Sequence, residues 1–282
     1  MAGSSMKDIK LRIKSVESTM QITKAMQLVA TSKLRRAKER MESSKPYAVI
    51  SREAVQAAVM RCEDGNAPFL AVRPLKRRLY IIIAGERGLA GGYNSNVFKA
   101  VAAHVGDTEY CVMPLGRKAV EKYHRMGIEL LSDRYTRVEG VSVGESYRIA
   151  KMVIAGYQEE KYDEVWLAGT SFRSMMSQEV VLEQLLPLAR PEETGEKRSP
   201  STLYEMDAAE TLQRIVPDFL AGRIYGALCD AFISEVSARR MAMDSASKNA
   251  EAMISDLTLR YNRARQGAIT QEITEIVAGA EQ

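Results

Sequence analysis

The sequence of 282 residues is poor in the residue types that build metal centres and disulfide frameworks. Its three cysteines, Cys62, Cys111 and Cys229, lie far apart and form no CxxC pair, and its only histidines are His104 and His124. We therefore expect neither a disulfide framework nor a metal site. Unpaired cysteines are typical of a reducing compartment.

Long apolar runs are also absent. No stretch of 18 consecutive apolar residues occurs, so no transmembrane helix is expected. The first ten residues, MAGSSMKDIK, have neither the apolar core of a signal peptide nor the composition of a transit peptide. We expect a protein of this kind to reach a membrane only through partners.

Glycine (18), proline (8) and aromatic residues (6%) are scarce, whereas methionine is frequent (15). With 46% hydrophobic and 27% charged residues, a mostly disordered chain is excluded. Few helix breakers and many aliphatic residues favour long helices. The net charge of +4 is too small to require a nucleic-acid partner.

The first 60 residues predict one helix or two, with Pro46 as their only proline. A first group of apolar residues recurs at steps of four, three and four: Ile9, Ile13, Val16 and Met20. A second group continues on a shifted stripe: Ile22, Met26 and Val29. This spacing is typical of a coiled coil with a break in register.

The middle of the chain alternates between strand and helix patterns. Residues 62–75 are similar to a linker, and residues 189–202 form a polar loop that we expect to be mobile. Short apolar runs predict strands at 78–84, 109–115, 128–131, 163–168 and 180–188. Helices are expected between them at 93–105, 117–126 and 143–160. This alternation predicts an open, mainly parallel, Rossmann-like α/β sheet.

From residue 206 to about 278 the pattern returns to helix. Apolar residues recur at a mean step of about 3.7, close to a straight helix: Ala246, Ala250, Met253, Leu257, Tyr261, Ala264 and Ala268. So long a helix cannot be enclosed by a domain of this mass, so most of it should project and pair with the N-terminal helix. We expect an antiparallel coiled coil from residues 1–60 and 206–282, with an α/β domain at 75–205.

Two segments could carry chemistry on their own. The glycine-rich run GERGLAGGYN (85–94) follows a predicted strand and precedes a helix, which suits a phosphate-binding loop. It matches neither nucleotide fingerprint, so a tight turn is the favoured interpretation and a nucleotide-dependent enzyme the alternative. Ser171, Ser174 and Ser177 lack the G-x-S-x-G elbow of a nucleophile.

The basic N-terminal segment leaves open a nucleic-acid binder, although no aromatic residue precedes Pro46 to stack on bases. The segment LTLRYNRARQ (257–266) is dense in arginine, asparagine and glutamine. Such a surface suits the carboxylates and carbonyls of another protein. The alternative is simple solubilisation of a helix, for which lysine and glutamate are more usual.

Three segments together resemble the gamma subunit of F-type ATP synthases: residues 9–37, the turn GLAGGYN (88–94) and residues 234–280. The resemblance runs through nearly the whole chain. Ala90 stands where many members have cysteine, and a small residue serves the same turn. No dithiol insertion of the light-regulated chloroplast form occurs near 189–202, which favours a bacterial-type member.

The resemblance implies a central-stalk rotor that couples proton flow to ATP synthesis or hydrolysis and regulates both. Its partners would be the alpha and beta subunits, the epsilon subunit and the membrane c-ring, with no nucleic acid. It implies that Met26, Arg265 and Gln266 contact the beta-subunit loops and that Arg239 and Arg240 face the sleeve further down. An apolar tip would turn in a collar: Ile269, Ile273, Ile276 and Val277.

The resemblance further implies that the chain has no catalytic site, cofactor or metal of its own. It would lie peripherally at the cytoplasmic face of a bacterial plasma membrane. The alternative is an organellar inner membrane or a thylakoid membrane.

Overall fold

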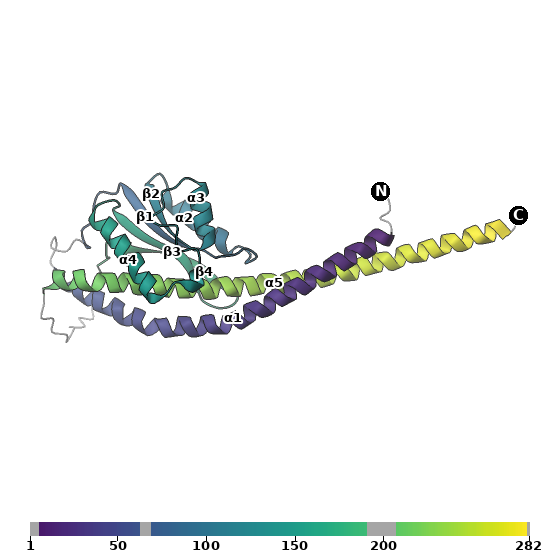
Figure 1. The fold of residues 1–282 in the computed structure, drawn as a ribbon, viewed down its shortest axis with the longest axis horizontal. Coiled ribbons are helices and arrows are strands. Elements are labelled where there is room, and N and C mark those ends of the chain that lie inside the picture. Colours follow the sequence, from purple (N-terminus) through teal and green to yellow (C-terminus); the bar gives the residue numbers. More distant parts are fainter. Residues whose placement is uncertain (1–5, 63–68, 191–206, 281–282) are drawn as a thin grey trace. The chain divides into compact units, whose positions relative to one another are not determined.

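The computed structural model describes residues 6–62, 69–190 and 207–280 (Figure 1). The chain divides into two compact units. The first contains residues up to 32 together with residues from 239 onward, and the second contains residues 33–238. The predicted domain boundaries at residues 60, 75 and 206 follow helix and linker patterns rather than contacts, and they stay predictions.

Each end of the chain forms a single long helix. Helix α1 spans Met6–Arg61 and helix α5 spans Ala208–Ala280, so the N-terminal segment is one helix and not two. Pro46 lies inside α1 and Pro217 inside α5. Few breakers and a continuous apolar repeat account for this length.

The two helices run antiparallel, as predicted. Within the first unit, Thr23 contacts Ser247 and Gln27 contacts Asp244. Residue numbers therefore fall along α5 as they rise along α1. Within the second unit, Arg40 contacts Tyr225 and Tyr47 reaches the carbonyl of Asp218 in the same sense.

The predicted break in register of α1 is wrong. The buried and half-buried positions continue in steps of four and three without a shift: Ile9, Ile13, Val16, Met20, Thr23, Gln27, Ala30, Leu34, Ala37 and Met41. Ile22 and Val29 are 58% and 59% exposed. Polar Thr23 and Gln27 therefore occupy the seam, and the apolar stripe through Ile22 faces away from it.

The predicted stripe of α5 needs two corrections, of which the first is that buried Ser247 stands in the seam in place of half-buried Ala246. Met253 is 46% exposed, and Ile254 takes its place in the seam. The observed positions again alternate steps of four and three: Met243, Ser247, Ala250, Ile254, Leu257, Tyr261, Ala264 and Ala268. A repeat near 3.5 keeps one face turned toward the partner helix, as in a coiled coil.

The second unit contains a four-stranded sheet in the order β2-β1-β3-β4. The strands are β1 (Arg77–Ile83), β2 (Glu109–Leu115), β3 (Glu164–Phe172) and β4 (Gln178–Leu186). β1 pairs in parallel with β2 and β3, and β4 is antiparallel to β3. The mainly parallel α/β sheet is thereby confirmed. The predicted strand at 128–131 is reduced to one bridge between Val112 and Leu130, because this short segment meets β2 at a single point.

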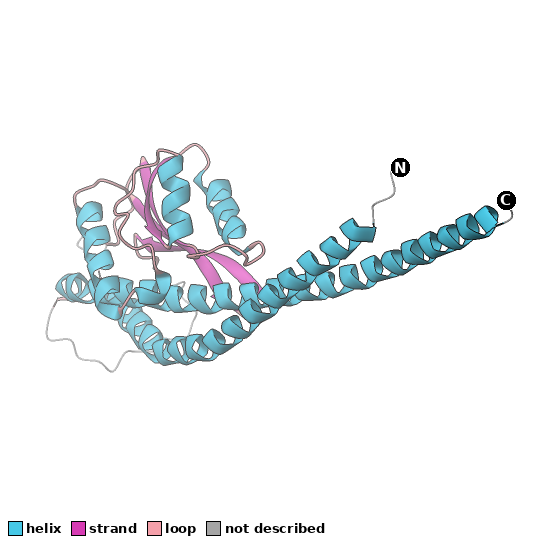
Figure 2. Ribbon diagram, turned by 45° about the vertical axis from the view of Figure 1, so that its right-hand side comes forward, coloured by secondary structure: helices cyan, strands magenta, loops and turns pink. Residues whose placement is uncertain are grey.

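Helices cover both faces of this sheet (Figure 2). Helices α2 (Tyr93–Val105) and α3 (Arg117–Arg125) share one core cluster with Tyr80, Ile82 and Ala168. On the other face, α5 contacts β3 and β4. Helix α4 (Val143–Gln158) packs along β3 and starts from a capping box between Ser142 and Glu145. Most of the predicted loop 189–202 lies outside the described residues, as do Gly65 and Pro68 of the predicted linker.

Candidate interaction site on the terminal helices

The described residues of the first unit are all helical, and one short stretch of its seam is polar. The hydroxyls of Thr23 and Ser247 lie 2.7 Å apart and are buried. Lys24 Nζ lies 2.7 Å from Glu251 Oε1, and Gln27 Nε2 donates to Asp244 at 3.0 Å. The hydrogen bond from Lys248, with a smaller contribution from Gln27, lowers the pKa of Asp244. These pairs fix which residues of the two helices face each other.

The outer face of α1 carries an apolar stripe that the seam does not use. Leu11, Ile22 and Val29 are each more than half exposed. They are separated by eleven and seven residues, spacings that return to the same face of a helix. Leu28 is 71% exposed beside them. A row of exposed apolar side chains on a narrow helix pair is typical of a protein–protein contact.

The sequence-predicted contact residues lie at two levels of this helix pair. Met26 and Arg240 are half-buried near the same level, where the Arg240 charge also helps lower the pKa of Asp244. Arg239 is half-buried next to Arg240, whereas Arg265 and Gln266 are exposed. In the observed register Met26 faces the region near 245. Residues 265 and 266 therefore lie about 30 Å further along the coil.

The end of α5 is exposed on every side. In this register Met6, the first described residue of α1, lies opposite residues 264–269. All nine residues from 269 to 277 are exposed. The apolar ones are 46–71% exposed: Ile269, Ile273, Ile276 and Val277. Ile269, Ile273 and Ile276 are four and three residues apart, which places these three isoleucines along one stripe of the helix, and Val277 follows directly.

The glycine-rich segment of the second unit forms a tight turn. The backbone N–H of Gly85 donates to Asn94 Oδ1 at 2.7 Å, and Leu89 and Gly91 both have positive φ, at 62° and 57°. In open α/β sheets a nucleotide binds beyond the carboxyl ends of the strands. Here α5 fills that space, because Tyr93 donates its hydroxyl proton to the carbonyl of Ala231 at 2.9 Å.

Glu235 of α5 closes the same space. A Cβ added to Gly85 would lie 2.7 Å from its carboxylate oxygen, so the acid sits directly against the turn. A carboxylate at this point repels a phosphate, and the Gly85 N–H is already used. The tight-turn interpretation of residues 85–94 therefore fits the geometry better than a phosphate loop. No pattern in the sequence indicates that α5 fills this space.

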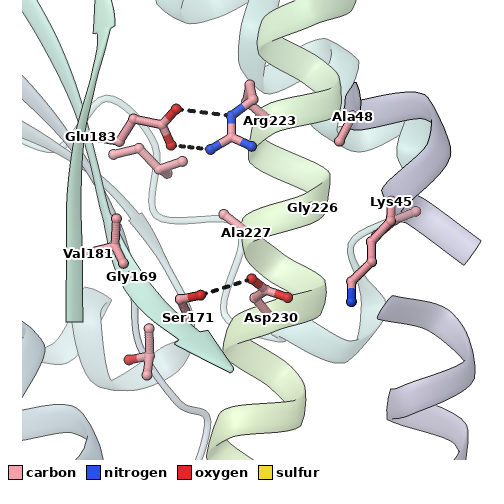
Figure 3. A pocket seen from close by; sticks show the side chains of 13 residues that line it. Lys45, Ala48, Gly169, Ser171, Val181, Glu183, Arg223, Gly226, Ala227 and Asp230 are labelled. Atoms are coloured by element: carbon pink, nitrogen blue, oxygen red, sulfur yellow. Dashed lines mark hydrogen bonds and ion pairs between the residues drawn. The ribbon is translucent and has the colours of Figure 1, made fainter. Parts of the chain in front are cut away.

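A pocket of about 190 Å³ lies between β3, β4, α5 and α1 in the second unit (Figure 3). Arg223 of α5 forms a two-pronged ion pair with Glu183 of β4 on one side. On the other side Ser171 donates to Asp230 at 3.5 Å, and burial raises the pKa of that carboxyl group. These contacts fasten α5 to the sheet. The sequence showed no partner for Glu183, because Arg223 lies 40 residues away.

The part of the chain that the structure describes contains neither a metal-binding cluster nor a membrane-spanning helix. No group of three or more histidine, cysteine, aspartate or glutamate residues could hold a metal ion there. None of its helices combines the length and apolar character needed to cross a membrane.

Comparisons with known proteins agree across the chain. A family model described as ATP synthase matches residues 5–282. The ATP synthase gamma chain of Ruminococcus albus is 43% identical over 280 residues, covering 97% of this chain and 96% of the relative. The sodium ion specific ATP synthase gamma chain of Acetobacterium woodii is 38% identical over 298 residues, covering 99% of each chain.

Solved structures share the fold at lower sequence identity. A chain of the Euglena gracilis mitochondrial ATP synthase rotor superposes with a TM-score of 0.67 at 16% identity, covering 94% of this chain and 98% of that one. A chain from the Tetrahymena thermophila mitochondrial central stalk and c-ring gives 0.59 at 22% identity, covering 80% and 99%. With full-length relatives at 38–43% identity and a matching family model, this chain belongs to the ATP synthase gamma chain family.

Proposed function

We propose that this chain is the central-stalk rotor of an F-type ATP synthase and couples ion flow through a membrane ring to ATP synthesis or hydrolysis. The observation that carries the proposal is a unit whose described residues form two paired helices, in a chain of the gamma family. A single asymmetric rod inside a ring of three equivalent catalytic subunits touches each of them differently. It therefore stabilises a different conformation in each, and rotation moves these differences from subunit to subunit.

The exposed side chains of the first unit are the proposed contacts with the alpha and beta subunits. The outer stripe of Leu11, Ile22 and Val29 offers apolar area, and the exposed tip around Ile273 offers more. We assign contact with the beta-subunit loops to Met26, Arg265 and Gln266, the last two through hydrogen bonds. Arg239 and Arg240 would face the sleeve at the second level. Guanidinium groups suit this role because they bind carboxylates and carbonyls through a planar fork.

The second unit is the proposed attachment to the membrane ring and to the epsilon subunit. The similar Tetrahymena thermophila chain comes from a structure described as a central stalk and c-ring, which supports the ring contact by fold alone. The relatives include a sodium ion specific chain, so either protons or sodium ions could be carried. A bacterial complex, with this chain held at the cytoplasmic face of the membrane by its partners, agrees with the bacterial relatives.

We further propose that the chain has no catalytic site of its own. The support is the filled space beyond β1, where Glu235 and the hydroxyl of Tyr93 hold α5 against the glycine-rich turn. The alternative, a nucleotide-dependent enzyme, would need α5 to leave this space.

The decisive experiment is co-expression of the chain with the alpha and beta subunits of a close bacterial relative. Native mass measurement should give three copies of each nucleotide-binding subunit per copy of this chain, and rotation should be visible during ATP hydrolysis. Replacing Arg265 and Gln266 by alanine should slow rotation, whereas Arg263→Ala serves as the matched exposed control. Nucleotide binding by the isolated chain in equilibrium dialysis, without assembly, would contradict the rotor and favour the enzyme.

A further inference from the structure

One arginine of α1 contacts two other parts of the second unit, the turn before α4 and helix α5. Arg40 Nη1 donates to the carbonyl of Glu139 at 2.8 Å, and Nη2 donates to the carbonyl of Val141 at 2.6 Å. Its Nε donates to the hydroxyl of Tyr225 on α5 at 3.1 Å. The guanidinium carbon also lies 5.1 Å from the centre of the Tyr225 ring. A planar fork can make these bonds in several directions at once, which a lysine ammonium on a flexible stem cannot match.

The two carbonyls belong to the turn that leads into α4. The Glu139 carbonyl lies within Val138–Gly140, a single 3-10 turn, and the Val141 carbonyl follows directly after it. Ser142 is then the N-cap of α4. Lys33, two helical turns before Arg40, reaches the Glu139 carboxylate at 2.8 Å on the surface of the same turn. Helix α4 packs along β3 through buried residues that include Ile149 and Val153. Arg40 therefore links α1, through α4, to the sheet.

Helix α5 is fastened to a different part of the domain. Arg223 binds Glu183 of β4, as Figure 3 shows, and Ser171 of β3 bonds to Asp230. Between α1 and α5 the seam at this level alternates small and large side chains, with Ala37 1% and Met41 6% exposed. Lys33 and Arg40 both hold α1 to the turn before α4. Of these two residues Arg40 also bonds to α5, so it joins all three elements.

We infer that Arg40 is the positioning residue that makes α1 turn together with the α/β domain, so that torque passes into both helices of the stalk. This inference rests on the proposed function. Without the three bonds, strain would move α1 along the domain before it moves the catalytic subunits. Hydrolysis would then continue with fewer ions moved for each ATP consumed.

The test uses the complete complex in membrane vesicles, with ATP hydrolysis and ATP-driven ion transport measured on the same preparation. Arg40→Met should keep hydrolysis within about twofold of wild type and lower the ratio of ions moved per ATP at least about threefold, because three hydrogen bonds from a charged group are lost. Arg40→Lys should also lower the ratio, since it keeps the charge and loses the fork. Arg35→Met is the matched control, because the Arg35 side chain is 86% exposed and its ion pair within the described residues is with Glu39, one turn away. The ratio of ions moved per ATP in Arg35→Met should equal that of wild type.

A merely structural role would lower the amount of assembled complex and leave the ratio unchanged. An unchanged ratio in Arg40→Met would therefore overturn the inference. If Arg40→Met does not assemble, Arg40→Lys and Tyr225→Phe decide, because Tyr225→Phe removes the hydroxyl that accepts from Arg40 and keeps the ring. Wild-type ratios in both would overturn the inference equally, and lowered ratios would support it. Failure of the wild-type complex to assemble or to transport ions would instead overturn the proposed function.

Discussion

The hydroxyl of Thr23 lies 2.7 Å from the hydroxyl of Ser247 in the buried seam between α1 and α5. Thr23 donates its single proton to the carbonyl of Met20 at 2.9 Å, so Ser247 is the donor in the pair. A buried polar pair in a coiled-coil seam fixes register, because any other register leaves both groups without a partner.

Removing both hydroxyls of this pair should destabilise the chain less than the two single removals added together. Thr23→Val or Ser247→Ala should each cost about 1 kcal/mol, since one buried hydroxyl loses its partner. The double variant should cost less than the two single costs added together, because no unpaired group remains. Urea unfolding of the full chain followed by circular dichroism measures all four free energies. Strictly additive costs would show that the two hydroxyls do not interact.

Two glycines in helices should respond oppositely to alanine. A Cβ at Gly156 in α4 would lie 2.4 Å from the hydroxyl oxygen of Tyr162, which is buried and bonds to the carbonyl of Val153. Gly156→Ala should therefore destabilise the chain by about 1–3 kcal/mol through overpacking. A Cβ at Gly226 in α5 meets nothing within 4 Å, so Gly226→Ala should stabilise by up to about 1 kcal/mol. Thermal melting of both variants separates these outcomes, and equal shifts would contradict the packing argument.

Strands β1 and β2 of the second unit could be predicted closely because they are buried on both faces. Such strands appear in the sequence as short continuous apolar runs, as in Leu79–Ile83. The helix at Tyr93–Val105 and the strand at Glu109–Leu115 have the predicted bounds. The strand expected at 128–131 was overestimated, because a four-residue segment with three apolar residues cannot show how far a neighbouring strand pairs with it.

The seam of α1 could not be predicted from apolarity. A rule that places apolar residues inside assigns Ile22 and Val29 to the seam, whereas the structure buries Thr23 and exposes both. The outward stripe indicates a second surface, and a single sequence cannot tell one partner from another. Arg40 was likewise missed, since its contacts with Glu139 and Tyr225 span 99 and 185 residues.

The buried carboxyl of Asp230 should make stability depend on pH. Burial raises its pKa in the folded chain above the ordinary value of 3.8. The folded chain therefore holds this proton more tightly than the unfolded chain does. The stabilising contribution is present below the ordinary value and is lost as the pH rises through the raised pKa.

Asp230→Asn removes this dependence while keeping a side chain that can bond to Ser171. The melting temperature of Asp230→Asn, relative to that of wild type at the same pH, should be higher at about pH 7 than at about pH 4. Thermal melts of both proteins at the two pH values measure the difference. A difference that stays constant, or that falls toward higher pH, would show that Asp230 does not titrate above its ordinary range.

The three cysteines should resist thiol reagents in the folded chain. Cys62, Cys111 and Cys229 are all buried, and burial raises the pKa of each thiol, that of Cys111 to about 11. The thiolate is the reactive form, so both access and ionisation are unfavourable. Iodoacetamide at mildly alkaline pH should modify none of them before unfolding and all three in guanidinium chloride. Rapid modification of Cys111 in the folded chain would contradict its burial beside β1.

The exposed stripe and the buried seam of α1 should respond differently to serine. Ile22→Ser changes a side chain that is 58% exposed, so the melting temperature of the isolated chain should stay close to wild type. Assembly with the alpha and beta subunits should weaken, because the variant removes apolar area from the proposed contact. Ala30→Ser is the matched seam control, since Ala30 is 4% exposed and a new hydroxyl there would need a partner. It should lower the melting temperature, and a complex that forms at raised subunit concentration should then have normal activity. If Ile22→Ser instead lowers the melting temperature and leaves assembly unchanged, the stripe is part of the fold and not a surface for the catalytic subunits.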